Sequence, residues 1–162
     1  MAGLHRKFSN RSHPGSRYHS PTMRRRSLLA AFLWSCVATR ARAHSYALGS
    51  LEIGHPWARP TTAQLGAAYC VLAVKGDTEE RLSYAETPIA ERVELRNAAG
   101  EAVHSIEIAP NRPVVLRPGK PYLALTGLKQ SLKLGESFPL TLRFDIAGEI
   151  IVTVMVENAP GE

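Results

Sequence analysis

The sequence predicts an all-β fold, a sandwich or barrel of short strands. From Tyr46 onward the apolar residues occur in short runs with a period near two, which is typical of strands with one buried face. Gly, Pro and Asn separate these runs, and no window sustains the longer repeat of an amphipathic helix. Many short strands at such spacing are typical of sandwiches and barrels.

We expect nine strands, which in chain order cover residues 47–54, 66–75, 80–86, 91–97, 102–108, 113–117, 121–126, 138–145 and 149–157. Several of them end in residues that favour tight turns, because Gly adopts backbone conformations that other residues avoid. These turns are Lys75-Gly76-Asp77, Ala99-Gly100-Glu101, Pro118-Gly119 and Ala147-Gly148.

The basic character of the chain belongs to its first 43 residues. The whole sequence carries a formal net charge of +6, but residues 44–162 hold eleven basic and fourteen acidic side chains, a net charge of −3. The composition therefore gives no reason to expect nucleic-acid binding by the folded part.

Residues 1–43 are predicted to be a leader with a secretory signal peptide. Met23-Arg24-Arg25-Arg26 begins a basic segment, 27–38 is apolar, and Ala41-Arg42-Ala43 has the small residues of a cleavage site. We expect Met23 to be the true start, export by a Sec or twin-arginine signal to the periplasm, and cleavage after Ala43. The apolar run is too short to span a bilayer, so we expect no membrane span after cleavage.

The remaining residues, 44–162, are predicted to form one domain without an internal disulfide. They contain a single cysteine, Cys70, although the expected compartment would permit disulfides. Cys70 lies in an apolar run, where we expect a buried thiol with a raised pKa.

Several segments carry a family resemblance. Residues 116–144 hold Leu116, Pro118-Gly119, Gly127-Leu128-Lys129-Gln130, Leu132, Gly135, Leu140-Thr141-Leu142 and Phe144. Earlier segments are Gly54-His55-Pro56-Trp57-Ala58-Arg59-Pro60-Thr61, Gly66-Ala67-Ala68-Tyr69, Arg81-Leu82 and Arg92-Val93-Glu94-Leu95. In this pattern the domain resembles the PCu(A)C-type periplasmic copper chaperones. The resemblance implies a cupredoxin-like Greek-key β-sandwich.

The metal ligands implied by the resemblance are missing. Copper(I) prefers thioether and imidazole donors, and the family gathers His and Met from two neighbouring loops. The equivalent positions here hold Arg96, Ala98, Tyr122 and Ala124. Met155, the one methionine after residue 43, lies in an expected strand and is predicted to pack.

Two replacement sites for copper are considered. His104, together with Tyr122, is one candidate for weak binding of divalent copper; the alternative is an exposed hairpin histidine and a packed tyrosine. His44 is the other, because a histidine at the mature terminus offers its α-amine and its ring to one ion. The alternative there is a frayed terminus.

The other polar residues of interest have structural interpretations beside functional ones. His55 is expected to fix the Pro56-Trp57 segment by a hydrogen bond. Trp57 and Arg59 suit either a recognition surface or a packed indole beside an extended arginine. Glu79-Glu80 is expected to be a solvated turn.

Two functional hypotheses follow. The first is a copper-chaperone-like binding protein with a degenerate or relocated metal site, whose partner would be an oxidase copper-site subunit or another copper chaperone. The second is a metal-free paralogue that acts as a protein-interaction module. No nucleophile elbow, phosphate-binding glycine loop or zinc-spaced His/Cys set is present in the sequence, so we expect no enzyme.

Overall fold

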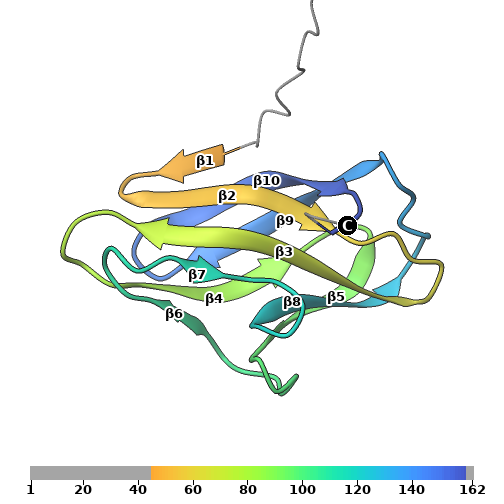
Figure 1. Cartoon of the computed structure of the whole chain (residues 1–162), viewed down its shortest axis with the longest axis horizontal. Coiled ribbons are helices and arrows are strands. Elements are labelled where there is room, and N and C mark those ends of the chain that lie inside the picture. Colours follow the sequence, from red (N-terminus) through yellow and green to blue (C-terminus); the bar gives the residue numbers. More distant parts are fainter. Residues whose placement is uncertain (1–44, 160–162) are drawn as a thin grey trace, which may run out of the picture. The chain divides into compact units, whose positions relative to one another are not determined.

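The computed structural model describes residues 45–159, and this part of the chain is all-β (Figure 1). Its strands are β1 (Ser45–Leu48), β2 (Leu51–Ala58), β3 (Leu65–Val74), β4 (Glu80–Glu86), β5 (Ala90–Arg96), β6 (Ile106–Ile108), β7 (Val114–Val115), β8 (Tyr122–Leu128), β9 (Ser137–Phe144) and β10 (Gly148–Val156). Within 45–159, no helix is long and apolar enough to cross a membrane. The expected leader and His44 lie outside the described residues.

The strands follow the order β5-β8-β3-β2-β10-β9-β4-β6, with β1 added to β2 and β7 added to β3. Neighbours in this order come from distant parts of the sequence, such as β3 with β8 and β2 with β10. The pairing of β2 with β10 is parallel, whereas the other described pairings are antiparallel. The expected fold class, a Greek-key β-sandwich, is confirmed.

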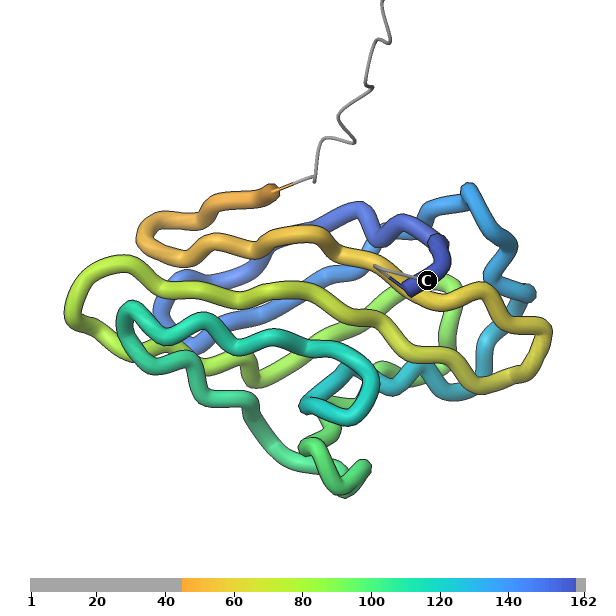
Figure 2. The backbone as a smooth tube through the Cα atoms, in the orientation of Figure 1, coloured from red at the N-terminus to blue at the C-terminus, as the bar shows by residue number. Residues whose placement is uncertain are grey.

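The first expected strand, 47–54, is a hairpin rather than one strand. β1 pairs with β2 around a turn at Gly49, whose φ is +60°. Figure 2 shows β1 lying along β2 at one end of the domain. Apolar alternation continues on both sides of the turn, so the pattern does not reveal where the chain reverses.

A bulge at His55 divides β2 into two halves. The register with β3 shifts between Gly54 and Trp57, and His55 has a φ of +47°. The first half of β2 pairs with β1 and the second half with β10. The His55 Nε2 atom lies 2.6 Å from the Glu157 carboxylate, so His55 ties the bulge to the segment after β10. This contact has the anchoring role that the sequence predicts for His55.

The core between the sheet layers consists of aliphatic side chains, two phenylalanines and Cys70. Its fully buried members include Leu51, Ile53, Leu72, Leu82, Ile108, Leu116, Leu123, Leu125, Leu140, Leu142, Val152 and Val154. Met155 is half-buried and pairs with Trp57 across β10 and β2. This position agrees with the packing role expected for Met155.

Glu80 is buried, and the expected solvated turn at Glu79-Glu80 is wrong for this residue. Glu80 is 6% exposed. Its carboxylate accepts hydrogen bonds from the backbone N–H groups of Ile146 at 3.0 Å and Ala147 at 2.7 Å, and from that of Arg81 at 2.8 Å. Glu80 therefore stabilises the turn that joins β9 to β10, whereas Glu79 is exposed.

We predict that Glu80→Gln lowers the free energy of unfolding by about 2–4 kcal/mol, because an amide cannot accept all three hydrogen bonds and leaves buried N–H groups unpaired. Urea denaturation of residues 44–162 measures the change. Glu79→Gln is the matched control and should stay within about 0.5 kcal/mol of the native value. Equal effects of the two changes would contradict this role of Glu80.

Candidate functional site

Four side chains from four neighbouring strands form one row across the sheet. Trp57 of β2 pairs with Tyr69 of β3, and Tyr122 of β8 pairs with Arg96 of β5. β3 and β8 are paired up to Ala68 and Leu123, and the next step of this register brings Tyr69 opposite Tyr122. We call Trp57, Tyr69, Tyr122 and Arg96 the cross-strand row.

Arg96, at the end of β5, is held by two short hydrogen bonds. Its Nη1 donates to the Gly100 carbonyl oxygen at 2.6 Å, and its Nη2 donates to the Glu94 carboxylate at 2.6 Å. Its Nε is buried and has no hydrogen-bond partner among the described residues. Because an ion pair with two fixed hydrogen-bond acceptors is directional, the guanidinium has a defined position.

The turn after β5 supplies the Gly100 acceptor. The Asn97 side-chain oxygen accepts hydrogen bonds from the N–H groups of Ala99 at 2.9 Å and Glu101 at 3.0 Å. Gly100 has a φ of +83°, a conformation that glycine adopts without strain. The strand expected at 102–108 is only partly correct, because regular strand pairing begins at Ile106 with β6. Only Ala102 still forms a bridge, with Arg96, before β6 begins at Ile106.

Tyr122 reaches the same turn from β8. A Cβ atom at Gly100 would lie 3.7 Å from the Tyr122 hydroxyl oxygen, so the hydroxyl lies over the turn that receives Arg96. Arg96, Tyr122 and Gly100 therefore meet at one end of the cross-strand row.

The other end of the row is aromatic. The rings of Trp57 and Tyr69 are 4.6 Å apart between centroids and tilted by 36°, a geometry typical of attractive aromatic pairs. Burial raises the pKa of Tyr69, the charge of Arg59 lowers it, and Tyr122 raises it. The effect of Tyr122 on the pKa of Tyr69 agrees with the place of Tyr69 beside Tyr122.

The structure brings together some of the predicted site residues. Arg96 and Tyr122 are direct cross-strand neighbours, while Ala98 is exposed in the turn and Ala124 is buried opposite Glu94. None of these four side chains offers an imidazole or a thioether. This position holds the fixed guanidinium of Arg96. It lacks the imidazole and thioether donors that copper(I) prefers.

Of the two proposed replacement ligands, the structure describes only His104. His104 is exposed in the connection before β6. Among residues 45–159, no three His, Cys, Asp or Glu side chains gather closely enough to hold a metal ion. His44 lies outside the described residues, and its role stays a prediction.

Sequence reasoning missed three residues of this site, namely Tyr69, Glu94 and Gly100. The first two lie in segments that carry the family resemblance, but only the strand register shows that they adjoin Arg96 and Tyr122. Gly100 lies in an expected turn, but no residue pattern encodes its role, which is that its carbonyl oxygen accepts a hydrogen bond from Arg96.

A family model described as LpqE-like, "Putative lipoprotein LpqE-like", matches residues 51–156. None of the curated proteins matches the chain.

Three similar solved structures carry PCuAC or copper(I) in their descriptions. The copper-bound PCuAC domain from PmoF2 is 28% identical with a TM-score of 0.66, and the match covers 72% of this chain and 99% of that one. The apo PCuAC domain from PmoF1 is 26% identical with a TM-score of 0.67, covering 72% and 100%. The Cu(I)-DR1885 structure from Deinococcus radiodurans is 26% identical with a TM-score of 0.57, covering 77% and 89%. These matches confirm the cupredoxin-like fold expected from the sequence.

We predict that Cys70 is unreactive in the folded domain. It is 2% exposed, and burial raises its pKa to about 12, so the thiolate needed for alkylation is scarce near neutral pH. Iodoacetamide at pH 8 should label it far more slowly in buffer than in urea, as measured by intact mass.

The same raised pKa has a consequence for stability. The unfolded thiol ionises near its ordinary pKa while the folded thiol keeps its proton, so the stability linked to Cys70 declines as the pH rises above about 8.5. Cys70→Ser should weaken this decline. Equal labelling rates in buffer and in urea would contradict the buried, protonated thiol.

Proposed function

The chain belongs to the LpqE-like family and has a PCuAC-type domain, and from this premise we propose that it is a copper-chaperone-like binding protein with a degenerate metal site. Copper is its cargo in this proposal, and we assign it no catalytic residue. Its structural neighbours include copper-bound and Cu(I) forms, which supports the link to copper.

The observation that carries the proposal is the position of Arg96. A guanidinium held by Glu94 and Gly100 takes the place where the family resemblance puts a histidine. A fixed positive charge repels a copper ion at short range, and the neighbouring Tyr122 provides a phenol instead of an imidazole. Copper(I) binding by the family arrangement is therefore unfavourable here.

Copper handling would then depend on relocated ligands. His104 is accessible to solvent, and a lone imidazole supports weak binding of divalent copper. His44, the other candidate, would offer an α-amine and a ring nitrogen to one ion if the signal peptide is removed after Ala43. We propose these two residues as the ligands of any copper that the mature domain carries.

The proposed location is the periplasm. The basic, apolar and small-residue segments before His44 support export, and the lipoprotein description of the family is consistent with an exported protein. An oxidase copper-site subunit or another copper chaperone is the proposed partner.

A second candidate function is a metal-free interaction module. The pairing of Arg96 with Glu94 supports it, because the site is occupied by an internal cation whose partner carboxylate is only 24% exposed. In this case the domain keeps the family fold and acts on a partner without carrying copper.

We predict that the native domain fails to hold copper(I) against a competing chelator, whereas Arg96→His, Ala98→Met, Tyr122→His and Ala124→Met together restore binding. Restoring two imidazoles and two thioethers should tighten copper(I) binding at least about tenfold. A chelator-competition titration of residues 44–162 under reducing conditions measures the difference. Tight one-to-one binding by the native domain, unaffected by changes at Arg96, would contradict the degenerate site.

Two further variants serve as a control and as an alternative in this test. Arg92→His changes an exposed arginine on the same strand and should restore nothing. The double variant Arg96→His, Tyr122→His keeps the small Ala124 side chain and serves if the fourfold variant does not fold. Circular dichroism and thermal melting establish the fold of each.

The same titration with divalent copper separates the two candidate functions. If the relocated ligands act, His104→Ala or one extra residue before His44 should weaken binding. If neither the native domain nor these variants binds divalent copper above the level of the chelator, the metal-free module is the better description.

A further inference from the structure

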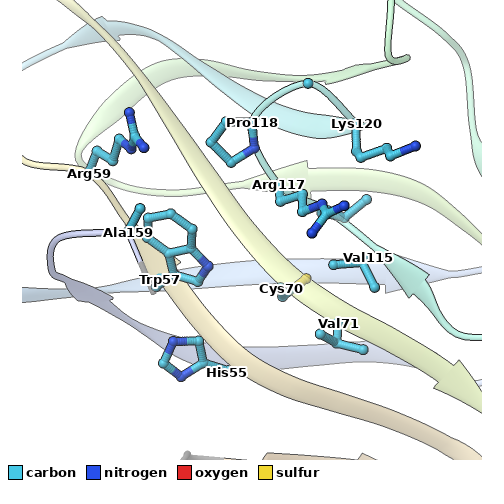
Figure 3. Close-up of a pocket in the computed structure, with 12 residues that line it drawn as sticks. His55, Trp57, Arg59, Cys70, Val71, Val115, Arg117, Pro118, Lys120 and Ala159 are labelled. Atoms are coloured by element: carbon cyan, nitrogen blue, oxygen red, sulfur yellow. The ribbon is translucent and has the colours of Figure 1, made fainter. Parts of the chain in front are cut away.

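A pocket outside the Arg96 end of the cross-strand row has a distinct chemistry. Its volume is about 520 Å³, and it is lined by His55, Trp57, Arg59, Cys70, Val71, Val115, Leu116, Arg117, Pro118, Gly119, Lys120 and Ala159. Figure 3 shows Trp57 and Arg59 on one side of β3 and the loop with Arg117, Pro118 and Lys120 on the other. Pockets that hold small molecules have volumes of about 300–1,000 Å³.

The inner surface of the pocket is mainly apolar. Trp57 and Val71 contribute side chains from β2 and β3, and Val115 contributes one from β7. Cys70 and Leu116 are buried, as is Trp57, so the buried residues of the lining carry no charge. An aliphatic or aromatic body would be desolvated favourably against these side chains.

The charged residues that line the pocket all have one sign. Arg59, Arg117 and Lys120 are exposed, and none of the described residues that line the pocket is acidic. His55 is already engaged with Glu157. Since residues 44–162 carry a net charge of −3, this cluster of basic side chains is a local feature and does not follow from overall composition.

The loop that carries two of these cations is fixed by its own hydrogen bonds. The Lys120 N–H donates to the Arg117 carbonyl at 3.0 Å, and Gly119 has a φ of +75°. Pro and Gly at the centre of such a turn are typical of type II geometry. The Leu116 N–H donates to the Cys70 carbonyl at 2.8 Å, which anchors the loop to β3. The basic groups are thus presented from an ordered loop.

From these observations we propose that the pocket binds a small amphiphilic anion, an organic carboxylate with an aliphatic or aromatic body. Its body would lie against Trp57, Val71 and Val115, and its carboxylate would face Arg117 and Lys120. A guanidinium donates two parallel hydrogen bonds to a carboxylate, which suits Arg117 at this rim. The proposal does not depend on copper binding, because Arg96 and Tyr122 do not line the pocket.

The chain provides its own probe for this site. Trp57 is the one tryptophan within residues 44–162, so its fluorescence reports on the pocket without interference from another indole. We would titrate the domain with octanoate, following Trp57 emission and heat by calorimetry. Octylamine and octanol, of equal chain length, test the charge requirement, and acetate tests the apolar requirement.

We expect saturable binding of octanoate, with octylamine, octanol and acetate each at least about tenfold weaker. Val115→Glu should abolish octanoate binding by placing a negative charge in the pocket, whereas Val115→Lys, of similar size at the same exposed position, should preserve it. Arg117→Gln with Lys120→Gln should weaken binding about tenfold, as expected for the loss of charged hydrogen-bond donors.

Lys133→Gln is the control for general charge effects, because Lys133 is exposed and does not line the pocket. It should leave octanoate affinity unchanged. Three results would overturn the proposal: octylamine binding as tightly as octanoate, equal affinities for Val115→Glu and Val115→Lys, or no calorimetric binding of octanoate by the folded domain.

Discussion

The hydrogen-bond register between β5, β8, β3 and β2 is the constraint on which the functional features depend. It brings Arg96, Tyr122, Tyr69 and Trp57 into one row although they are far apart in the sequence. Because side chains alternate between the two faces of a sheet, a shift of one residue in any of these pairings would turn a member of the row to the other face. The aromatic pair of Trp57 and Tyr69 and the place of Tyr122 opposite Arg96 depend on this register.

Arg96 changes what the family scaffold can do. Its guanidinium is paired with Glu94 and also bonded to Gly100, so a cation is already built into the place where the family resemblance puts a metal ligand. Glu94 lies within reach of a second arginine as well, with Arg92 at 3.8 Å. If position 96 held a histidine, the Glu94 carboxylate would still have Arg92 as an ion-pair partner. The family ligands can therefore be introduced without leaving Glu94 unpaired.

Much of the fold could be predicted from the sequence, because the two-residue apolar period and the glycine turns are local signals. Because these signals are local, they do not reveal chain reversals or contacts between distant segments, and two predictions were wrong for this reason. The alternation runs through Gly49, so the hairpin of β1 and β2 was expected as one strand, and Glu80 was expected in solvent although it binds N–H groups more than sixty residues away. The resemblance puts Arg96 and Tyr122 at the family metal site, and the strand register makes them direct neighbours. It could not show their contact with Gly100 or the basic rim around Trp57, since both depend on how distant segments meet.

The central claim is that Arg96 occupies the family metal position and excludes copper(I). It is tested most directly by nuclear magnetic resonance of the ¹⁵N-labelled domain, following the Arg96 guanidinium and the Tyr122 backbone while one equivalent of copper(I) is added under reducing conditions. We predict that neither signal moves and that the Arg96 Nε–H stays in slow exchange with solvent because it is buried. Matched, saturating shifts of Arg96 and Tyr122 at one equivalent would show that copper(I) enters this position and would contradict the account.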